Sequence, residues 1–218
     1  MVRKLRGTVG LFKVGSQLFT AEGPRAVEKL ADAGAKIFLD LKFHDIPNTV
    51  AKAVGAAVKL PGVRLLTLHA SSGSATMRAA REAAGDKKDR AKLLGVTVLT
   101  SFDQATLHEI GMSGSIEARA VALAQLAKAA GLDGVVCSTY EARAIRRASD
   151  SKFIILIPGV RPRSGAANDQ SRIGTPAEAI LAGADYLVVG RPITAAENPR
   201  AAALAIADEI ASVSPRSR

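Results

Sequence analysis

The segment AKIFLDLKFHDIPNTVAKAVGAAVKLPGVRLLTLH, residues 35–69, contains a complete strand, helix and second strand. Its two ends, AKIFLDLKF and VRLLTLH, are short apolar runs of the length and composition typical of buried strands. Between them, from Thr49 to Leu60, apolar residues recur at spacings of three and four, as in an amphipathic helix. Strands connected through a helix run parallel in a sheet, so this segment predicts a parallel α/β architecture.

The same alternation continues through the rest of the chain. Helical spacing recurs at 117–130 and 202–210. Five more strands are predicted, at VGLFKV (9–14), KLLGVTVL (92–99), LDGVVC (132–137), KFIILI (152–157) and ADYLVV (184–189). The repeat of roughly 30 residues per unit, without a Pro, Gly or Ser-rich linker, favours one TIM-type (β/α) barrel domain over residues 1–218.

The N-terminal residues MVRKLRGT are predicted to form the last turn of a helix that Gly7 stops. A closed barrel of this type has eight strands, and seven are predicted here, so the strand expected before this helical turn is the one not seen. We therefore expect an N-terminally incomplete barrel that begins inside its first helix. The strands near Val9 and Ala184 would then be unpaired edges.

Composition excludes several classes of protein. An apolar content of 48% in 218 residues supplies a large core, so the chain is not disordered. Lys and Arg number 30 against 20 Asp and Glu, giving a net charge of +10, but the charge is spread along the chain as on a solvated surface. Six Phe, two Tyr and no Trp leave few rings to stack on bases, so a nucleic-acid partner is not expected.

The sequence also indicates a cellular compartment. The apolar runs are strand-sized and none approaches the 18 residues of a membrane span, so no membrane partner is expected. The basic N-terminus lacks the apolar stretch of a secretory signal. A single cysteine, Cys137, excludes a disulfide framework and is expected in the core. We therefore expect a cytoplasmic protein.

Two charged residues interrupt the apolar strand IFLDLKF. Asp40 and Lys42 are two residues apart, so their side chains leave the same face, whereas Leu39, Leu41 and Phe43 face the helices. The charged face would look into the barrel near the end of the strand where such barrels place catalysis. Burying both charges is costly unless they pair, so either a catalytic pair or a structural ion pair explains them.

Lys13 and Asp45 are further candidates, each with a simpler explanation. Lys13 interrupts the apolar strand LFKVG, but a strand lysine is often an edge residue whose ammonium reaches water. Asp45 lies just before Pro47, at the expected first turn of a helix, where a carboxylate also favours the helix N-terminus.

Polar residues follow three later strands. Gly190 and Arg191, in VVGRPIT, follow the last strand, where barrels commonly bind phosphate, although the same residues could be a turn into a helix. Thr100 and Ser101 are predicted to end a strand, or to cap the next helix. The long loop at 158–176 has the composition of a lid or of mobile surface.

The three histidines, His44, His69 and His108, form no obvious metal-ligand set, so no metal is expected.

Taken together and in this order, KVGSQLF, DLKFHDIPNT, PGVRP, DQSR and VVGRPIT resemble the bacterial type of the orotidine 5′-phosphate decarboxylase family. The resemblance runs from about Gly7 to the C-terminal helix, and the DxKxxDIPNT signature is its most specific part. It implies decarboxylation of orotidine 5′-monophosphate to uridine 5′-monophosphate in de novo pyrimidine biosynthesis, without a cofactor, by a homodimer.

The resemblance also implies roles for individual residues. Lys13, Asp40, Lys42 and Asp45 would form a catalytic array of alternating charge, in which Lys42 stabilises and protonates a carbanion at C6 of the pyrimidine. The residues implied to bind substrate are Lys13, Asp40, Asp45, Thr49, Thr100, Ser101, Arg161, Gln170, Gly190 and Arg191. Asp45 and Thr49 would reach into the partner subunit's site. The family's first strand ends in an aspartate that contacts the ribose, and no residue before Lys13 can replace it.

Two other functions remain open at this point. A magnesium-dependent sugar-phosphate decarboxylase or aldolase on a similar barrel shares an Asp-x-Lys-x-x-Asp core and would be sensitive to a chelator. A barrel lacking a strand could also be a non-catalytic module that binds nucleotide phosphates or RNA, which salt-dependent RNA binding without turnover would support.

Overall fold

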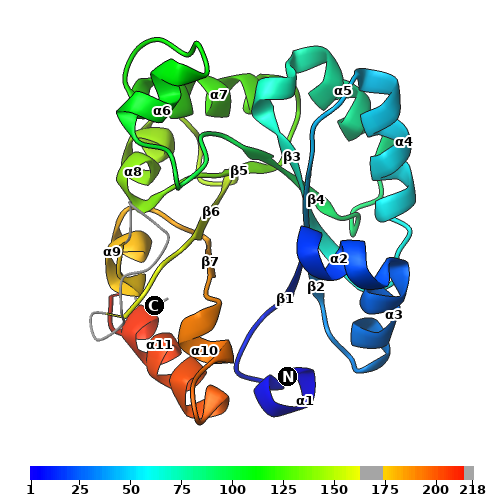
Figure 1. Cartoon of the computed structure of the whole chain (residues 1–218), viewed down its shortest axis with the longest axis vertical. Helices are drawn as coiled ribbons and strands as arrows, with labels where there is room; N and C mark the ends of the chain where they lie inside the picture. The colour runs from blue at the N-terminus through cyan, green and yellow to red at the C-terminus, as the bar shows by residue number, and fades with distance from the viewer. Residues whose placement is uncertain (163–173, 214–218) are drawn as a thin grey trace.

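Seven parallel strands form a single sheet whose order follows the chain (Figure 1). The computed structural model describes residues 1–162 and 174–213. The strands are β1 (Phe12–Gly15), β2 (Ile37–Phe43), β3 (Val63–His69), β4 (Lys92–Val96), β5 (Gly134–Val136), β6 (Ile154–Pro158) and β7 (Tyr186–Val188). The sheet curves into a nearly closed barrel with β1 and β7 at its two edges, which confirms the predicted TIM-type α/β barrel with seven strands.

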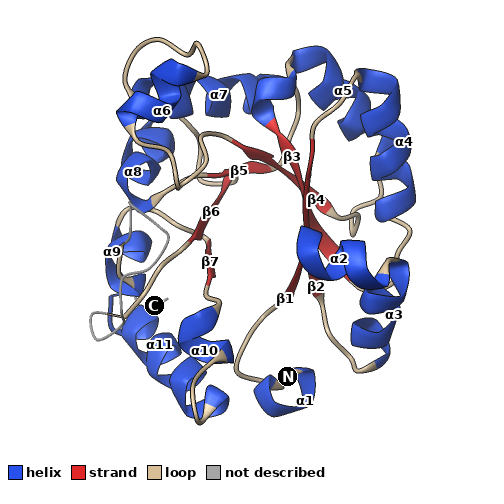
Figure 2. Cartoon of the chain, viewed as in Figure 1, coloured by secondary structure: helices blue, strands red, loops and turns tan. Residues whose placement is uncertain are grey.

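Helices cover the outside of the curved sheet (Figure 2). The longer ones are α3 (Pro24–Asp32), α4 (Pro47–Ala57), α5 (Ser74–Ala83), α7 (Ile116–Ala129), α8 (Thr139–Arg147) and α11 (Pro199–Val213). The shorter ones are α1 (Val2–Leu5), α2 (Ser16–Glu22), the 3-10 turn η1 (Ala70–Ser72), α6 (Gln104–Glu109), α9 (Pro176–Leu181) and α10 (Arg191–Thr194). The predicted helical turn before Gly7 is α1, and Gly7 itself has a positive φ of 77°.

Several predicted strands are longer than the strands of the structure. The prediction for 92–99 was wrong at its C-terminal end, because β4 stops at Val96. The physical reason lies in its neighbour: β5 ends at Val136, so the chain beyond Thr97, which donates to the Val136 carbonyl, has no strand to pair with. Strand ends therefore depend on the partner strand as well as on local apolar pattern.

The alternation of side chains along each strand creates two apolar layers. Leu39 joins the large cluster that the strands share with the helices, whereas the neighbouring Phe38 belongs to a second cluster. The buried members of this second cluster all come from strands, namely Phe38, Leu65, Leu94, Val96, Val136 and Leu156. They fill the inside of the barrel, as expected for a parallel sheet that is buried on both faces. Cys137, predicted to be a core residue, is fully buried.

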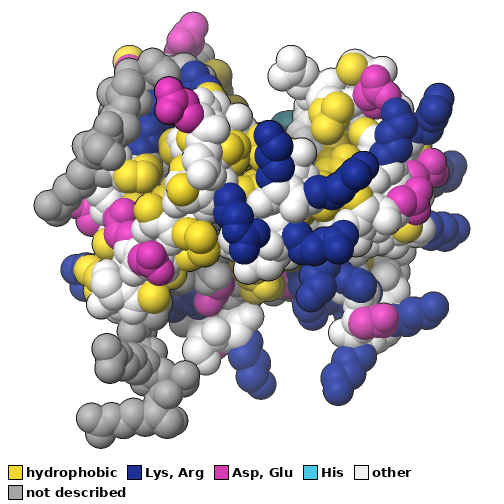
Figure 3. All heavy atoms as spheres, turned by 90° about the horizontal axis from the view of Figure 1, so that it is seen from below, with side chains coloured by type: hydrophobic (Ala, Val, Ile, Leu, Met, Phe, Trp, Pro, Cys, Tyr) yellow, Lys and Arg dark blue, Asp and Glu magenta, His cyan; other side chains and the backbone are white. Residues whose placement is uncertain are grey.

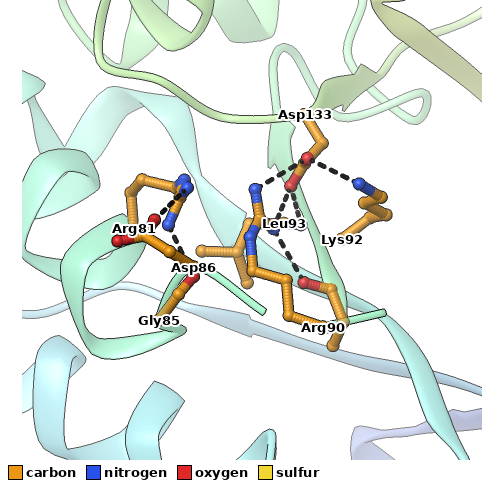
Figure 4. Close-up of polar contacts among 8 residues, drawn as sticks. Arg81, Gly85, Asp86, Arg90, Lys92, Leu93 and Asp133 are labelled. Carbon is orange, nitrogen blue, oxygen red and sulfur yellow. Dashed lines mark hydrogen bonds and ion pairs between the residues drawn. The ribbon is translucent and has the colours of Figure 1, made fainter. Parts of the chain in front are cut away.

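An aspartate fastens the start of β5 to β4 (Figure 4). The Asp133 carboxylate accepts the Leu93 N–H at 2.8 Å and two hydrogen bonds from Arg90 at 2.6 and 2.9 Å, and Lys92 lies 3.5 Å away. Burial alone would raise the pKa of Asp133, but the hydrogen bonds from Arg90 and Leu93, with the charges of Arg90 and Lys92, outweigh it and lower the pKa. The ionised carboxylate thus fixes the register at this end of the barrel.

The start of β7 repeats this arrangement on β6. Asp185 accepts the Ile155 N–H at 2.8 Å and a hydrogen bond from Arg146 at 2.6 Å, while its own N–H donates to the Ile155 carbonyl at 2.8 Å. Both aspartates stand two residues after a glycine of positive φ that follows a helix, Gly131 and Gly183. The sequence pattern Gly-x-Asp before a strand therefore marks both aspartates that bond to the neighbouring strand.

In the part of the chain that the structure describes, no helix is both long and apolar enough to cross a membrane.

Candidate active site

The two charged residues of β2 lie in a β-bulge. Leu39 pairs with Leu66 of β3, but the next pair is Phe43 with Leu68, so β2 carries two more residues than β3 over this interval. Within the bulge Lys42 has a φ of 52°, and among the described residues it is the non-glycine residue with positive φ. Bulges of this kind interrupt the backbone ladder and re-aim side chains, often beside active sites.

The bulge brings the two charges into direct contact. Lys42 Nζ donates to both carboxylate oxygens of Asp40 at 2.8 Å. Thr67 of β3 links the pair to the neighbouring strand: its hydroxyl donates to Asp40 Oδ1 at 2.9 Å and accepts the Lys42 N–H at 3.0 Å. The Thr67 side chain thus replaces a backbone partner that the bulge removes. The predicted pairing of Asp40 with Lys42 is seen in the structure.

A second ammonium faces the same carboxylate. Lys13 Nζ of β1 lies 3.6 Å from Asp40 Oδ2. The Asp40 side chain is 12% exposed, whereas those of Lys13 and Lys42 are 38% and 35% exposed. One nearly buried carboxylate therefore faces two ammonium groups that can still be reached from outside. This excess of positive charge suits an anionic ligand.

Two histidines extend the site on the side of β3. His44 follows β2 and His69 ends β3, and their ring centroids are 5.1 Å apart with the ring planes tilted by 33°. Burial lowers the pKa of His69, as do the charges of His44 and Lys42, while Asp40 acts in the opposite direction. His69 is therefore held neutral near Lys42 at physiological pH.

Asp45 and Thr49 lie apart from this cluster in the single chain. Both are exposed, Asp45 before α4 and Thr49 within its first turn. The Asp45 carboxylate accepts the N–H of its neighbour Ile46 at 2.6 Å. Among the contacts of the described residues, it makes no ion pair with Lys42. Both residues therefore face outward from the chain, at a surface where Ile46 is 66% exposed.

The remaining predicted residues follow the C-terminal ends of other strands. Gly190 precedes the short helix α10, whose first residue is Arg191, and both residues are exposed. Arg161, after β6, is buried, and its N–H donates to the Gly174 carbonyl at 3.1 Å. Gln170 lies outside the described residues. Because all strands are parallel, their C-terminal ends meet at one end of the barrel, where Asp40 and Lys42 also lie.

The prediction for Thr100 and Ser101 was wrong in its structural detail. They lie in a turn after β4 and do not end the strand. The residue that caps α6 is Asp103, whose carboxylate accepts the Thr106 N–H at 2.8 Å, so neither Thr100 nor Ser101 is the helix cap. Both still follow the C-terminal end of a barrel strand.

Thr67, His44 and His69 lie at this site, although no role for them was predicted from the sequence. Thr67 is a buried polar residue in the middle of the mostly apolar strand VRLLTLH, a signal that becomes informative once β3 is known to lie beside β2. Over residues 1–162 and 174–213, no group of three or more His, Cys, Asp or Glu side chains could hold a metal ion. The charged groups at this site are thus two ammonium groups held by one carboxylate, an arrangement that can stabilise developing negative charge and deliver a proton.

Comparison with known proteins identifies the family. Residues 1–206 match the profile of the family described as Orotidine 5'-phosphate decarboxylase / HUMPS. A relative from Syntrophotalea carbinolica named orotidine 5'-phosphate decarboxylase is 54% identical over 215 residues, covering 96% of this chain and 88% of the relative. One of the same name from Nitrosococcus oceani is 50% identical over 213 residues, covering 98% of this chain and 91% of the relative.

A solved structure agrees with these sequence matches. The crystal structure of orotidine 5'-phosphate decarboxylase from Lactobacillus acidophilus superimposes with a TM-score of 0.79 at 39% identity, covering 91% of this chain and 85% of that one. The match in sequence thus extends to the barrel itself. The chain therefore belongs to the orotidine 5′-phosphate decarboxylase / HUMPS family, and its kinship lies with the decarboxylases of that family.

Proposed function

We propose that this chain decarboxylates orotidine 5′-monophosphate to uridine 5′-monophosphate without a cofactor, as a step of pyrimidine biosynthesis. The observation that carries the proposal is the contact of Lys42 Nζ with both oxygens of Asp40, in a bulge near the C-terminal end of a barrel strand. Relatives that are 50% identical or more carry the name of this activity.

Lys42 supplies the chemistry in this proposal. When the bond between C6 and the carboxylate carbon breaks, carbon dioxide departs and the electron pair stays on C6. The Lys42 ammonium stabilises that negative charge and transfers a proton from Nζ to C6, after which the neutral amine regains a proton from water. Asp40 holds the ammonium in place through both of its carboxylate oxygens. The Asp40 carboxylate is nearly buried, which strengthens its electrostatic interaction with Lys42.

Other residues bind the rest of the nucleotide in this proposal. Arg191 and the backbone at Gly190 hold the phosphate, since the forked guanidinium and the N–H groups that begin α10 suit a dianion. Lys13, which contacts Asp40, also holds a ribose hydroxyl. Thr100, Ser101 and Arg161 approach from the ends of β4 and β6, and Gln170, outside the described residues, bridges the base and the phosphate by family resemblance.

The active unit is proposed to be a homodimer with shared sites. Asp45 and Thr49 are exposed beside Ile46, which is 66% exposed, so this edge is available for a second subunit. Asp45 of one subunit would then complete the charge array around Lys42 of the other. A cytoplasmic location belongs to the same proposal and is supported by the single, buried cysteine.

The decisive experiment measures loss of orotidine 5′-monophosphate absorbance by the purified chain in EDTA. We expect turnover, and a loss of at least about a thousandfold in Lys42→Ala, because the proton donor is gone. Lys59→Ala, which removes an exposed lysine after α4, is the matched control and should keep full activity. Turnover that needs added magnesium would instead support a metal-dependent enzyme of similar fold, and appreciable activity in Lys42→Ala would refute the assigned role.

A further inference from the structure

His44 and His69 leave the sheet side by side at the C-terminal ends of two neighbouring strands. Phe43 of β2 pairs with Leu68 of β3, so each histidine is the next residue along its own strand. The ring centroids are 5.1 Å apart, within the range of aromatic rings in contact. The two rings therefore connect the segment that follows β2 with the end of β3.

The His69 side chain lies on the inner face of β3, toward the charged pair. Leu68 belongs to the outer cluster that the strands share with the helices, whereas Thr67, the residue before it, bonds to Asp40 at 2.9 Å. Side chains alternate between the two faces of a strand, so His69 is on the same face as Thr67. Its ring is therefore part of the active-site end of the barrel and not of the outer core.

The backbone of His69 is held on two sides. His69 pairs with Val96 of β4, and its carbonyl accepts the Ser72 hydroxyl of the turn η1 at 2.6 Å. Its side chain is half-buried. Strand pairing, the bond to the turn and partial burial together fix the position of the imidazole, so it is a firm support for any group that it contacts.

The segment that follows β2 is much more open. Residues 44–49 are all exposed in the single chain. The His69 ring contacts the first of them, His44, and the hydroxyl of buried Thr76 in α5 donates to the carbonyl of the second, Asp45, at 3.5 Å. Both contacts come from the part of the chain that ends or follows β3. Asp45 therefore stands on a segment whose position depends on its contacts with that part.

A neutral imidazole is suited to this contact. Lys and Arg side chains gather on the face shown in Figure 3, where they extend from the surface and can spread into water. At the active site, by contrast, the ammonium groups of Lys13 and Lys42 already face the one carboxylate of Asp40. Burial, with the charges of His44 and Lys42, lowers the pKa of His69, so its ring packs against His44 without adding a third cation.

We infer that His69 is a positioning residue for Asp45: through its ring contact with His44 it holds residues 44–46 where Asp45 can enter the partner subunit's site. This role rests on the proposed function, in which Asp45 of one subunit completes the charge array around Lys42 of the other. His69 would thus assist the reaction of the neighbouring subunit, although it lies near Lys42 of its own chain. The competing role is a direct action of His69 on that Lys42.

Substitutions that remove or keep the ring test the contact. His69→Ala should lower kcat about tenfold, because Asp45 loses its support, whereas His69→Phe keeps a ring there and should stay within about threefold of the original. His44→Ala should match His69→Ala, and the double variant should lose no more than either single one, because all three remove the same contact. His108→Ala, at an exposed position of α6, is the control and should stay within about twofold. Circular dichroism verifies that each variant is folded.

Mixed dimers distinguish the partner subunit's site from the chain's own. When a Lys42→Ala chain pairs with a His69→Ala chain, one site combines the intact Lys42 of the second chain with the Asp45 that the intact His69 of the first chain holds. We therefore expect random mixing with co-refolding to give about one quarter of the original turnover. If His69 acted on Lys42 of its own chain, that same site would carry the defect, and the mixture would have only about one twentieth.

The mixture of Lys42→Ala with Asp45→Ala separates this role of His69 from the sharing of sites. Recovery in that mixture without recovery in the mixture containing His69→Ala would show that sites are shared and would overturn the inference. Verified mixed dimers without recovery in either mixture would refute the sharing, and with it any role of His69 in a partner's site. Equal losses of kcat in His69→Phe and His69→Ala would also overturn the inference. Absence of turnover in the original chain would refute the proposed decarboxylation itself.

Discussion

The Lys42 ammonium lies 2.8 Å from both carboxylate oxygens of Asp40, although only Leu41 separates the two residues in the chain. In a regular strand such side chains would stand side by side about 7 Å apart along one face. The bulge in β2 and the left-handed backbone of Lys42 bring them together, and Thr67 of β3 bonds to both. The site therefore depends on the register of two neighbouring strands.

Replacing Thr67 tests two roles of this residue, its contribution to folding stability and its placement of Asp40 and Lys42 for catalysis. Thr67→Val leaves the Lys42 N–H and Asp40 Oδ1 each short of one hydrogen bond, so we expect a loss of about 1–3 kcal/mol in the free energy of unfolding. Displacement of Asp40 and Lys42 should also lower kcat about tenfold. Urea denaturation and steady-state kinetics measure the two effects.

Thr97→Val is the control for that substitution. Thr97 is buried after the neighbouring strand β4 and donates to the Val136 carbonyl at 2.9 Å, with no bond to Asp40 or Lys42. We expect a similar loss of stability and a kcat within about twofold of the original. If Thr97→Val lowered kcat as much as Thr67→Val, Thr67 would have no positioning role.

Mixing two inactive variants tests the proposed sharing of sites. In a heterodimer of a Lys42→Ala chain with an Asp45→Ala chain, one site carries both substitutions and the other has neither. Random mixing should therefore restore about one quarter of the original activity. The measurement is turnover after co-refolding, with native mass spectrometry to verify the mixed dimer. Verified mixed dimers without turnover would exclude shared sites.

Stability should depend on His69 as the pH falls below the ordinary value of 6.5. The pKa of His69 lies below its ordinary value of 6.5 in the folded chain, so the unfolded chain takes up the proton first as the pH falls. The free energy of unfolding contributed by the neutral imidazole is present above pH 6.5 and is lost as the pH decreases below it. His69→Asn should lose less stability over this interval than the original chain.

His108 provides the comparison for His69. It is an exposed histidine on α6, and His108→Asn should leave the pH dependence of urea denaturation as it is in the original chain. An unchanged pH profile in His69→Asn would show that its imidazole has no part in the loss of stability.

Asp133 and Asp86 offer a paired test of buried and exposed ion pairs (Figure 4). The Asp133 side chain is 12% exposed and that of Asp86, which pairs with Arg81, is 92% exposed. We expect Asp133→Asn to cost about 2–4 kcal/mol at pH 7, because Arg90 and the Leu93 N–H lose an ionised partner. Asp86→Asn should cost less than about 1 kcal/mol.

The pH dependence of the Asp133 effect follows from its lowered pKa. The stability that the ionised carboxylate contributes is present above the ordinary value of 3.8 and is lost as the pH falls through the lower pKa of the folded chain. The difference between the original chain and Asp133→Asn in urea denaturation should therefore shrink in acid. A difference that stayed constant down to the acid transition would argue against this linkage.

The architecture was predictable because each strand and each helix has a local sequence pattern of its own. Every predicted strand contains or overlaps an observed one, and 63–69 matches β3 at both ends. The ends of the others were not predictable from local pattern, since a strand such as β4 stops where its neighbour stops. The alternation of Phe38 and Leu39 between the inner and outer layers was also readable from the sequence alone.

Much of the site was predictable in its residues but not in its geometry. Asp40 and Lys42 stand out because charges are costly in an apolar strand. The bulge that joins them has no local signal, because the residue with positive φ is a lysine, where glycine is the usual choice. Thr67 becomes recognisable only with the register of β2 on β3. Asp45 is exposed in the single chain and would join the site only through the proposed second subunit.

The backbone of Lys42 places stability and chemistry in competition at a single residue. A non-glycine residue held at a φ of 52° costs about 1–3 kcal/mol relative to relaxed backbone. Glycine would relieve that cost at this position, but it would also delete the amine on which the proposed reaction depends. Directed evolution for thermostability, run without a screen for turnover, should therefore select Lys42→Gly and yield an inactive barrel. A screen for turnover should instead retain Lys42 in its costly conformation.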